Sequence, residues 1–311
     1  MAPLPNETIP TPASTPADGR SEFPFDLVAT DLDGTLLNSE KKMTDATKDT
    51  LRQLHFDHGV KIVMASGRPV ENMVCLYREL GIHDAHVIGH NGAKCLKITS
   101  EDDHEEFFHS AIAPDLCVEL FKFCQKRNLC VTMYRGGVCV ALKSDEEKFA
   151  DLHKVFSEVT TNEIWEYVDN CEDVKKMNLT SGVIVCDNEQ DADAVMGELK
   201  QYMTPEQAHI VKTECGNFRH HKFFVEVLHP LANKGKALKI LCDKLDVDPS
   251  KVISFGDGEN DLEMFEFSGK SISMANACPK AKEVSDQVSE HSNIEEAVHK
   301  ELSNILSSEN M

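Results

Sequence analysis

The sequence has no stretch that approaches about 18 consecutive apolar residues, which argues against a membrane-spanning helix. It is also poor in basic residues. The 32 lysines and arginines face 53 aspartates and glutamates, for a formal charge of −21. A negative field of this size disfavours binding to nucleic acid and to anionic membranes, and we expect neither partner. If the substrate is itself an anion, some local feature must reverse the field.

The eleven cysteines are scattered along the chain, and no C-x-x-C pair occurs among them. Paired zinc knuckles and redox dithiols need closely spaced cysteines, so both kinds of site are disfavoured. An odd number at irregular positions indicates reduced thiols, many of them packed as small apolar side chains. Because such thiols belong in a reducing compartment, we predict a cytoplasmic location.

The first 24 residues differ in composition from the rest of the chain. They hold six of the twelve prolines, and Ser, Thr and Ala fill most of the other positions. The segment lacks the apolar stretch of a secretory signal, and its single basic residue, Arg20, is poor for an organellar transit peptide. We predict that residues 1–24 form a disordered tail rich in Pro, Ser and Thr.

Residues 25–93 alternate between two patterns. Short apolar runs bounded by turn residues are typical of buried parallel strands, and segments with helical periodicity lie between them. The same alternation returns after residue 222, which predicts an α/β fold with a parallel sheet. The expected strands are 25–30, 60–65, 87–88, 252–255 and 272–274, and the expected helices run from Thr44 to Gly59, through Val74 and Leu80, and over 235–245.

The middle of the chain has a mixed pattern. Helical segments are expected over 114–127 and 190–202, and strands over 138–142, 179–186 and 210–211. This mixture predicts an α+β domain over residues 94–221. It would be inserted between the two parts of the α/β domain, residues 25–93 and 222–311.

Four short polar segments accompany the predicted α/β elements. In an open parallel sheet, the ligand crevice lies beyond the carboxyl ends of the strands. Three of the segments directly follow such strands, and the other opens a helix, where backbone N–H groups favour an anion. The segments are Asp31–Thr35, Ser66–Pro69, Asn233–Lys236 and Gly256–Asp261.

The side chains in these segments suit phosphoryl chemistry. Asp31 stands at a strand end and is a workable covalent nucleophile. Asp33 can approach the same centre from another angle and act as a general acid and then as a base. Ser66 supplies a hydroxyl donor, and Lys234 supplies the positive point charge that phosphate sites often use.

Asp257 and Asp261 add two more carboxylates, and such hard oxygen ligands suit Mg²⁺. Two unit charges about 4 Å apart repel by about 4 kcal/mol at an effective dielectric constant of about 20. A phosphate dianion that faced Asp31 and Asp257 would meet several such terms, which Lys234 alone cannot offset. A divalent cation can offset them. The acidic residues therefore predict a Mg²⁺-dependent site for a phosphorylated substrate.

Together the four segments resemble the motifs of the haloacid dehalogenase (HAD) phosphatase superfamily, whose first motif is D-x-D-G-T. Asp31–Thr35 matches it in full, and Ser66, Lys234 and the G-D-x-x-N-D run match the later motifs in order. The long interval between Ser66 and Lys234, together with Asn91-Gly92-Ala93, is similar to the Cof-type branch with a type IIB cap. The resemblance implies a Rossmann-like parallel-sheet core with an inserted α+β cap that controls substrate specificity.

The resemblance also implies catalytic and metal-binding roles. Asp31 would become the aspartyl-phosphate. Asp33 would protonate the leaving alcohol, then activate water, and lend its backbone carbonyl to Mg²⁺. Asp257 would bind Mg²⁺, with Asp261 either on the metal or one step removed from it, so the implied metal residues are Asp31, Asp33, Asp257 and Asp261.

For the phosphate, the resemblance implies a cradle made of Ser66, the Gly67 amide and Lys234, with Asn260 hydrogen-bonded nearby. Two further residues have two readings each. Arg68 either contacts the substrate or pairs with Asp257 or another carboxylate. Asn91 either shapes a turn with Gly92 or faces the crevice at the domain boundary.

We predict a Mg²⁺-dependent phosphohydrolase of small phosphorylated metabolites, such as sugar phosphates, with a cap that closes over the site and disfavours large substrates. Two alternatives are a phosphomutase of hexose phosphates and a non-catalytic sensor of a phosphometabolite. Against the sensor stand intact Asp31, Asp33, Lys234 and Asp257, because a sensor needs no nucleophile. The sequence leaves the oligomeric state open.

Overall fold

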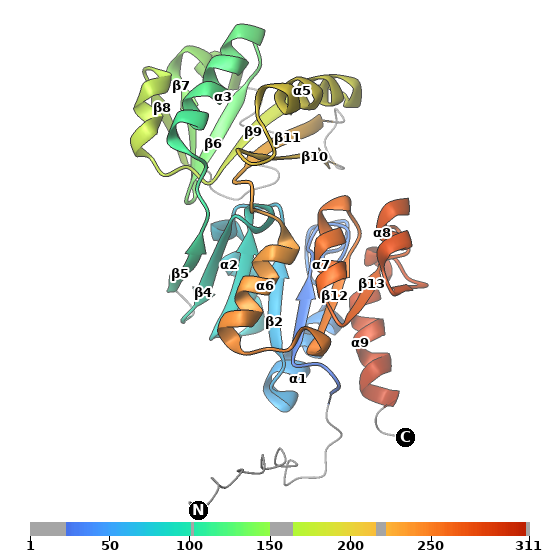
Figure 1. Cartoon of the computed structure of the whole chain (residues 1–311). Coiled ribbons are helices and arrows are strands. Elements are labelled where there is room, and N and C mark those ends of the chain that lie inside the picture. The colour runs from blue at the N-terminus through green and yellow to red at the C-terminus, as the bar shows by residue number, and fades with distance from the viewer. Residues whose placement is uncertain (1–22, 101–102, 150–163, 216–221, 309–311) are drawn as a thin grey trace, which may run out of the picture.

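The computed structural model describes residues 23–100, 103–149, 164–215 and 222–308, which form two units stacked one above the other (Figure 1). Each unit is built around its own β-sheet. We call the eight-stranded sheet with its helices the core unit, and the six-stranded sheet with its helices the cap unit. The chain passes between them through residues 110–113 and 229–233. The tail predicted for residues 1–24 lies almost wholly outside the described residues.

The core sheet is parallel over six strands and antiparallel at one edge. Its order is β14-β13-β12-β1-β2-β3-β4-β5, and β4 and β5 are the antiparallel strands. The strands are β1 (Leu27–Thr30), β2 (Lys61–Ala65), β3 (Ala85–Gly89), β4 (Lys94–Ile98), β5 (His104–His109), β12 (Val252–Gly256), β13 (Lys270–Ser273) and β14 (Gln287–Val288).

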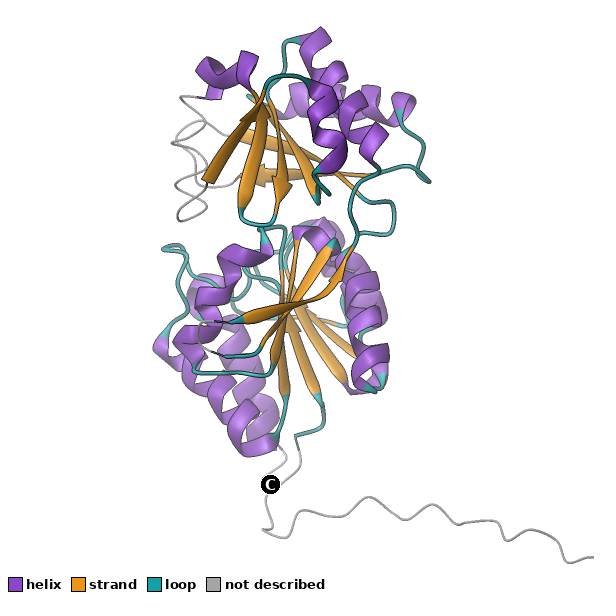
Figure 2. Cartoon of the chain, turned by 90° about the vertical axis from the view of Figure 1, so that its left-hand side faces the viewer, coloured by secondary structure: helices purple, strands orange, loops and turns teal. Residues whose placement is uncertain are grey.

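Helices cover both faces of the core sheet (Figure 2). Alternate residues of a strand point to opposite faces. In β1, Leu27 and Ala29 therefore pack with α6, whereas Val28 packs with α1, α2 and α9. As expected, Thr44 caps α1 and Gly59 ends it in the left-handed conformation. The core helices are α1 (Asp45–His58), α2 (Val74–Leu80), α6 (Lys234–Leu245), α7 (Leu262–Phe267), α8 (Pro279–Val284) and α9 (Ala297–Ser308).

The cap unit has helices on one face of a mainly antiparallel sheet. Its strand order is β10-β11-β9-β6-β7-β8, and α3 and α5 pack on the apolar face that includes Val225 and Val227. Phe224 and Glu226 alternate with these residues along β11 and lie on the opposite face. The cap elements are α3 (Pro114–Arg127), β6 (Val131–Arg135), β7 (Val138–Leu142), β8 (Ile164–Val168), β9 (Ser181–Cys186), α5 (Glu189–Tyr202), β10 (His209–Cys215) and β11 (Lys222–Leu228).

The predicted fold class, a parallel α/β core with an inserted α+β unit, is confirmed. The sheet pairing nevertheless differs from the predicted boundaries at 93/94 and 221/222. After the turn at residues 90–92 the chain reverses and adds β4 and β5 to the core sheet before it leaves. Conversely, β11 begins at residue 222 but pairs with β10 and β9 in the cap sheet. The assignment of catalysis to the core unit and of substrate specificity to the cap unit stays a prediction.

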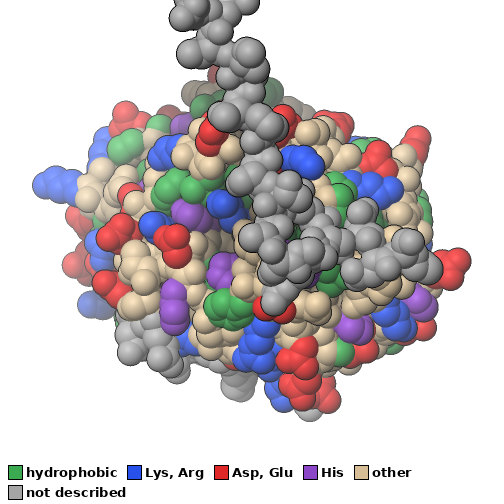
Figure 3. Space-filling view, turned by 90° about the horizontal axis from the view of Figure 1, so that it is seen from below, with side chains coloured by type: hydrophobic (Ala, Val, Ile, Leu, Met, Phe, Trp, Pro, Cys, Tyr) green, Lys and Arg blue, Asp and Glu red, His purple; other side chains and the backbone are tan. Residues whose placement is uncertain are grey.

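Charge is mixed over the surface of the core unit that faces away from the cap. Figure 3 shows acidic and basic side chains interspersed there, wherever the grey atoms do not cover the view. On this visible face the net charge of −21 is therefore not gathered into one patch. Within the described part of the chain, none of the helices combines the length and the apolar character that crossing a membrane would require.

Candidate active site

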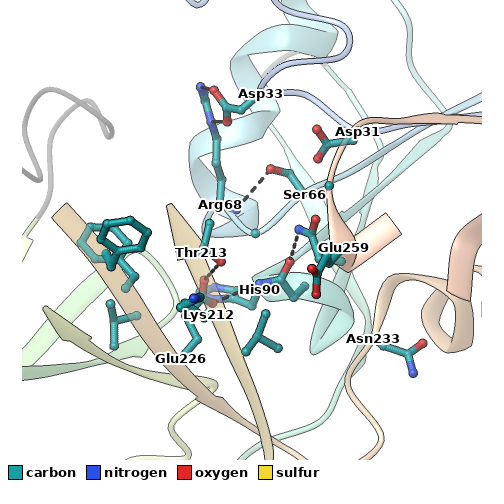
Figure 4. A pocket seen from close by; sticks show the side chains of 18 of the residues that line it. Asp31, Asp33, Ser66, Arg68, His90, Lys212, Thr213, Glu226, Asn233 and Glu259 are labelled. Atoms are coloured by element: carbon teal, nitrogen blue, oxygen red, sulfur yellow. Dashed lines mark hydrogen bonds and ion pairs between the residues drawn. The ribbon is translucent and has the colours of Figure 1, made fainter. Parts of the chain in front are cut away.

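The candidate active site lies between the two units, at the carboxyl edge of the parallel core strands. Asp31, Ser66 and Asp257 directly follow β1, β2 and β12, which are neighbours or next neighbours in the sheet. Because parallel strands end at the same edge, these three side chains come together. They line a cavity of about 1240 Å³, and residues of both units contribute to its lining. Figure 4 shows Asp31 and Ser66 in this lining.

A buried lysine lies behind this edge. Lys234 opens α6, whose first turn is capped by Asn233, and its Nζ lies 2.6 Å from Oδ1 of Asp31 and 2.6 Å from Oδ1 of Asp261. The side chains of Lys234 and Asp261 have no exposed surface. Burial by itself lowers the pKa of Lys234, but the charges of Asp261 and Asp31 outweigh it and raise the pKa. The ammonium group therefore stays charged beneath the site.

Asp261 also holds the loop that carries Asp257. Its Oδ2 accepts hydrogen bonds from the backbone N–H groups of Asp257 and Gly258, each at 2.9 Å. Thr35 Oγ1 donates to Oδ1 of Asp257 at 3.0 Å, which links this loop to the one after β1. Burial and the charge of Asp261 raise the pKa of Asp257 to about 6.

Asp31, Asp257 and Asp261 form a cluster that fits a metal ion. One carboxylate oxygen from each lies within 4.8 Å of the others. Burial, helped by the charges of Asp261 and Asp257, raises the pKa of Asp31 well above its usual range, although Lys234 works in the opposite direction. Three carboxylates thus face one ammonium group, and an all-oxygen donor set of this kind suits Mg²⁺.

Asp33 has a different set of partners. Nε and Nη2 of Arg68 lie 2.6 and 2.7 Å from its two carboxylate oxygens, and Nζ of Lys41 lies 2.6 Å from Oδ1. Figure 4 shows the carboxylate turned toward Arg68. Burial raises the pKa of Asp33, but the hydrogen bonds and charges of Arg68 and Lys41 outweigh it and lower the pKa. Of the two readings of Arg68, the structure displays the ion pair, and its partner is Asp33 rather than Asp257.

The loop after β2 is held against the turn that carries Asn91. Oγ of Ser66 accepts from the backbone N–H of Arg68 at 3.3 Å, and the carbonyl of Ser66 accepts from the N–H of Asn91 at 3.0 Å. A Cβ on Gly67 would lie 3.2 Å from Nδ2 of Asn91. Gly92 has a φ of +100°, and a Cβ there would fall 2.2 Å from the carbonyl oxygen of Asn233, so only glycine fits.

The Asn91 side chain lies at the boundary between the two units. Its Oδ1 accepts from Nδ2 of Asn260 at 2.9 Å, and its Nδ2 donates to Oε2 of Glu226 at 3.1 Å. Asn91 therefore both shapes the turn with Gly92 and faces the crevice. It joins two other residues of the lining, one from each unit.

The structure thus brings the predicted residues together in three groups. Asp31, Lys234, Asp257 and Asp261 form the buried network, Asp33 pairs with Arg68, and Asn91 joins Asn260 beside the loop of Ser66 and Gly67. Lys234 and Asp261 are not among the residues that line the cavity.

Sequence reasoning missed two residues of this site. Lys41 lies in the loop between β1 and α1, where a lone lysine carries no signal. Glu226 lies on the cap strand β11 and is 6% exposed. The only available hint is a single acidic residue within the apolar run Phe223–Leu228.

Comparisons with known proteins identify the family of the chain. The haloacid dehalogenase-like hydrolase family matches residues 28–302. The 5-amino-6-(5-phospho-D-ribitylamino)uracil phosphatase YitU of Bacillus subtilis is 25% identical over 262 residues, which cover 84% of this chain and 90% of the relative. Phosphatase YwpJ of the same organism is 24% identical over 279 residues, which cover 84% and 93%.

A solved structure supports the fold as well. The haloacid dehalogenase-like hydrolase from Bacteroides thetaiotaomicron matches with a TM-score of 0.74 at 23% sequence identity, and the match covers 90% of this chain and 99% of that chain. The resemblance that the four motifs indicate is therefore confirmed, and with it the prediction of a hydrolytic enzyme. The matched region contains all four motifs, and the chain belongs to the haloacid dehalogenase-like hydrolase family.

Proposed function

We propose that the protein is a Mg²⁺-dependent phosphohydrolase of small phosphorylated metabolites, sugar phosphates or similar phosphomonoesters, and that it works through an aspartyl-phosphate on Asp31. The observation that carries the proposal is the buried ammonium of Lys234, held 2.6 Å from both Asp31 and Asp261, behind the cavity that Asp31 lines between the two units. Two relatives whose own names describe phosphatases support it.

Asp31 is suited to act as the nucleophile. Its Oδ1 accepts from Lys234, and no hydrogen bond from the rest of the described chain involves its Oδ2. The ammonium group offsets part of the energetic cost of an ionised carboxylate in a buried place. Oδ2 is then the oxygen that forms the bond to phosphorus as the bond to the leaving oxygen breaks.

The acidic cluster would hold Mg²⁺ through the carboxylates of Asp31 and Asp257 and the backbone carbonyl of Asp33. Asp261 would stand behind them, because its two oxygens already accept from Lys234 and from the loop of Asp257. When bound, Mg²⁺ neutralises the repulsion between these carboxylates and a phosphoryl group. The predicted phosphate residues Ser66, Gly67 and Asn260 lie on the same cavity lining.

Asp33 would act as the general acid and base. Arg68 and Lys41 hold it as a carboxylate, which is the form that accepts a proton from the attacking water. A phosphate dianion in the cavity would compete with Asp33 for Arg68. That competition would raise the pKa of Asp33 and favour the protonated form that donates to the leaving alcohol.

The cavity also bears on the size of the substrate. Sites for small molecules are typically clefts or cavities of about 300–1,000 Å³, and the volume here, about 1240 Å³, lies somewhat above that range. We propose that the core unit carries the chemistry and that the cap unit contacts the leaving group. We propose a small phosphorylated metabolite in the cytoplasm as the substrate.

The test is an assay of released phosphate with p-nitrophenyl phosphate, glucose 6-phosphate and mannose 6-phosphate, in Mg²⁺ and in EDTA. We expect hydrolysis in Mg²⁺, its loss in EDTA and its return when Mg²⁺ is restored. Asp31→Asn should lower kcat by roughly a thousandfold or more while circular dichroism stays unchanged. Full activity in EDTA, or hydrolysis by Asp31→Asn at near the wild-type rate, would contradict the proposal. A rearranged sugar phosphate without free phosphate would identify a mutase instead.

A further inference from the structure

A chain of three hydrogen bonds crosses from the cap unit into the loop after β12. Thr213 Oγ1 donates to Oε1 of Glu226 at 3.2 Å, and these two residues are labelled in Figure 4. Nδ2 of Asn91 donates to Oε2 of Glu226 at 3.1 Å. Asn260 Nδ2 then donates to Oδ1 of Asn91 at 2.9 Å. Thr213 and Glu226 belong to cap strands, whereas Asn91 and Asn260 belong to the core. The chain therefore joins the two units at the cavity.

Glu226 is an unusual residue to find at this position. It is 6% exposed, and within the described ranges no lysine, arginine or histidine forms an ion pair with it. Burial raises its pKa to about 7, against the hydrogen bonds of Thr213 and Asn91 and the charge of Lys234. A buried acid without an ion-pair partner contributes little to stability, and an apolar residue of similar volume would cost less. A role beyond packing is therefore indicated.

The chain also has a direction. When Glu226 is ionised, its carboxylate only accepts hydrogen bonds, and Asn91 then presents its Nδ2 to Glu226 and its Oδ1 to Asn260. Asn260 must in turn present its Nδ2 to Asn91. The second hydrogen on that nitrogen is left for another acceptor, and a phosphate oxygen is one. The carboxylate on the cap thus sets the orientation of two amides in the core.

Asn91 also borders the loop that follows β2. Its backbone N–H donates to the carbonyl of Ser66 at 3.0 Å, and a Cβ on Gly67 would lie 3.2 Å from Nδ2 and 3.3 Å from Oδ1 of Asn91. Asn91 itself is 2% exposed and has a φ of +50°. A change in the orientation of the Asn91 amide would therefore alter the surroundings of Gly67.

We propose that Glu226 is a positioning residue for the phosphate site: from the cap it orients the Asn91 amide and, through it, Asn260 and the surroundings of Gly67. This inference rests on the proposed function, because it takes the phosphate of the substrate to bind beside Gly67 and Asn260. The phosphate site is complete only while β11 is seated against the core.

The first experiment compares a variant that lacks a hydrogen-bond acceptor at position 226 with a variant that keeps one. Glu226→Leu has no acceptor, whereas Glu226→Gln keeps an oxygen that can accept from Asn91. We expect Glu226→Leu to weaken the binding of inorganic phosphate in Mg²⁺, measured by calorimetry, and to lower kcat/KM for p-nitrophenyl phosphate, each by roughly tenfold. Glu226→Gln should recover most of both losses. A Gln variant as weak as the Leu variant would overturn the proposal.

A matched control tests whether any lost carboxylate in the cap sheet has this effect. Glu166 lies on β8 of the same sheet and accepts from Arg135 at 2.5 Å, and it has no contact with Asn91. Glu166→Leu should leave phosphate binding and turnover unchanged. Wild-type phosphate affinity in Glu226→Leu, or an equal loss in Glu166→Leu, would contradict a positioning role.

The second experiment exchanges donor and acceptor, and it also covers the case in which Glu226→Leu does not fold. Asn91→Asp sets two carboxylates face to face and interrupts the series of hydrogen bonds between the cap and Asn260, with little change in side-chain shape. Adding Glu226→Gln restores it, because the Gln amide can donate to the new carboxylate. We expect Asn91→Asp to weaken phosphate binding roughly tenfold and the double variant to regain most of it. Glu166→Gln on the Asn91→Asp background should restore nothing. No recovery in the double variant would overturn the proposal.

The two hypotheses fail in different ways. If the wild-type protein releases phosphate from no ester, the proposed function is wrong, while the pattern of phosphate binding among the variants still decides the role of Glu226. If the wild-type protein hydrolyses p-nitrophenyl phosphate and Glu226→Leu does so equally well, the positioning role is wrong and the phosphohydrolase stands.

Discussion

Arg68 holds Asp33 through two parallel hydrogen bonds, with Nε 2.6 Å from Oδ2 and Nη2 2.7 Å from Oδ1. This bidentate geometry is the strongest that an arginine and a carboxylate form. Lys41 adds a contact of 2.6 Å to Oδ1. The contacts with Arg68 and Lys41 therefore favour the ionised form of the proposed general acid. A bound phosphate ester has to weaken the contacts of Arg68 and Lys41 with Asp33 before Asp33 can be protonated.

The first prediction concerns the pH profile of Arg68→Ala. Removing Arg68 takes away the larger part of what lowers the pKa of Asp33, so this pKa rises. Activity that needs protonated Asp33 falls as the pH rises through its pKa, and a higher pKa extends that activity to higher pH. We expect the alkaline limb of kcat/KM for p-nitrophenyl phosphate to move upward by about one pH unit.

The control for this prediction is Arg52→Ala. The guanidinium of Arg52 binds the backbone oxygens of Leu80 and Glu79 in the core unit and has no contact with Asp33. Its profile should match that of the wild type. An alkaline limb that stays in place in Arg68→Ala would show that Asp33 does not set it.

The second prediction concerns the stability that Lys234 provides. Lys234→Met leaves Asp31 and Asp261 buried without their counter-charge. Breaking a buried pair in this way costs about 3–5 kcal/mol of the free energy of unfolding. We expect that loss in urea denaturation near about pH 7 without Mg²⁺. Lys239→Met on the same helix removes an exposed pair with Asp243 and should change the free energy by about 0.5 kcal/mol or less. Equal effects of the two substitutions would contradict the prediction.

Much of this site could be predicted from the sequence because it is built on strand ends. Asp31, Ser66 and Asp257 each follow an apolar run, and the alternation of strands and helices indicates a parallel sheet. Once the strands are parallel, their carboxyl ends must meet at one edge. The buried position of Lys234 was not predictable, because a lysine at the start of a helix is ordinarily solvated. Its burial depends on the two carboxylates that the fold brings to it.

The cap side of the site could not be predicted in this way. A glutamate on a strand is usually a solvent-facing residue of an alternating pattern, and only the docking of the cap sheet on the core buries Glu226. The pairing of β4 and β5 with the core sheet could not be predicted for a similar reason. β4 and β5 follow a turn at Asn91 and Gly92, and nothing in their residues distinguishes a strand that pairs with β3 from one that begins a new sheet.

The third prediction concerns the glycine beneath Asp257. Gly34 has a φ of +87°, and a Cβ there would fall 2.3 Å from Oδ2 of Asp257. Gly34→Ala must therefore displace the carboxylate that is proposed to bind Mg²⁺. We expect the Mg²⁺ concentration that gives half-maximal hydrolysis of p-nitrophenyl phosphate to rise roughly tenfold.

Gly59→Ala separates backbone strain from displacement of the carboxylate. Gly59 has a φ of +71°, and nothing lies within 4 Å of a Cβ built on it. The strain of an alanine at the end of α1 is thus similar, at a cost of about 1 kcal/mol of stability. Its Mg²⁺ requirement should equal that of the wild type. If Gly34→Ala also keeps that requirement, Asp257 is not a metal ligand.

The fourth prediction concerns the acid side of the stability profile, through Glu71. Oε1 of Glu71 lies 2.7 Å from Nζ of Lys94, while Oε2 lies 3.9 Å from Nε2 of His90, which is beyond hydrogen-bond distance. Burial alone raises the pKa of Glu71, but His90 and Lys94 outweigh it and lower the pKa from 4.5 to about 2. A carboxylate with a lowered pKa stabilises the fold above its unfolded pKa, and this stabilisation is lost as the pH falls toward the folded one.

Glu71→Gln should therefore be less stable than the wild type by on the order of 2 kcal/mol near about pH 7. The difference should shrink as the pH falls from 4.5 toward about 2, the window between the ordinary and the lowered pKa of Glu71. Urea denaturation of both proteins at a series of pH values measures it. As a control, Glu79→Gln removes a half-exposed pair with Lys48 and should give a small difference. A gap for Glu71→Gln that is the same at about pH 3 as at about pH 7 would mean that packing, not the charge on Glu71, accounts for the loss.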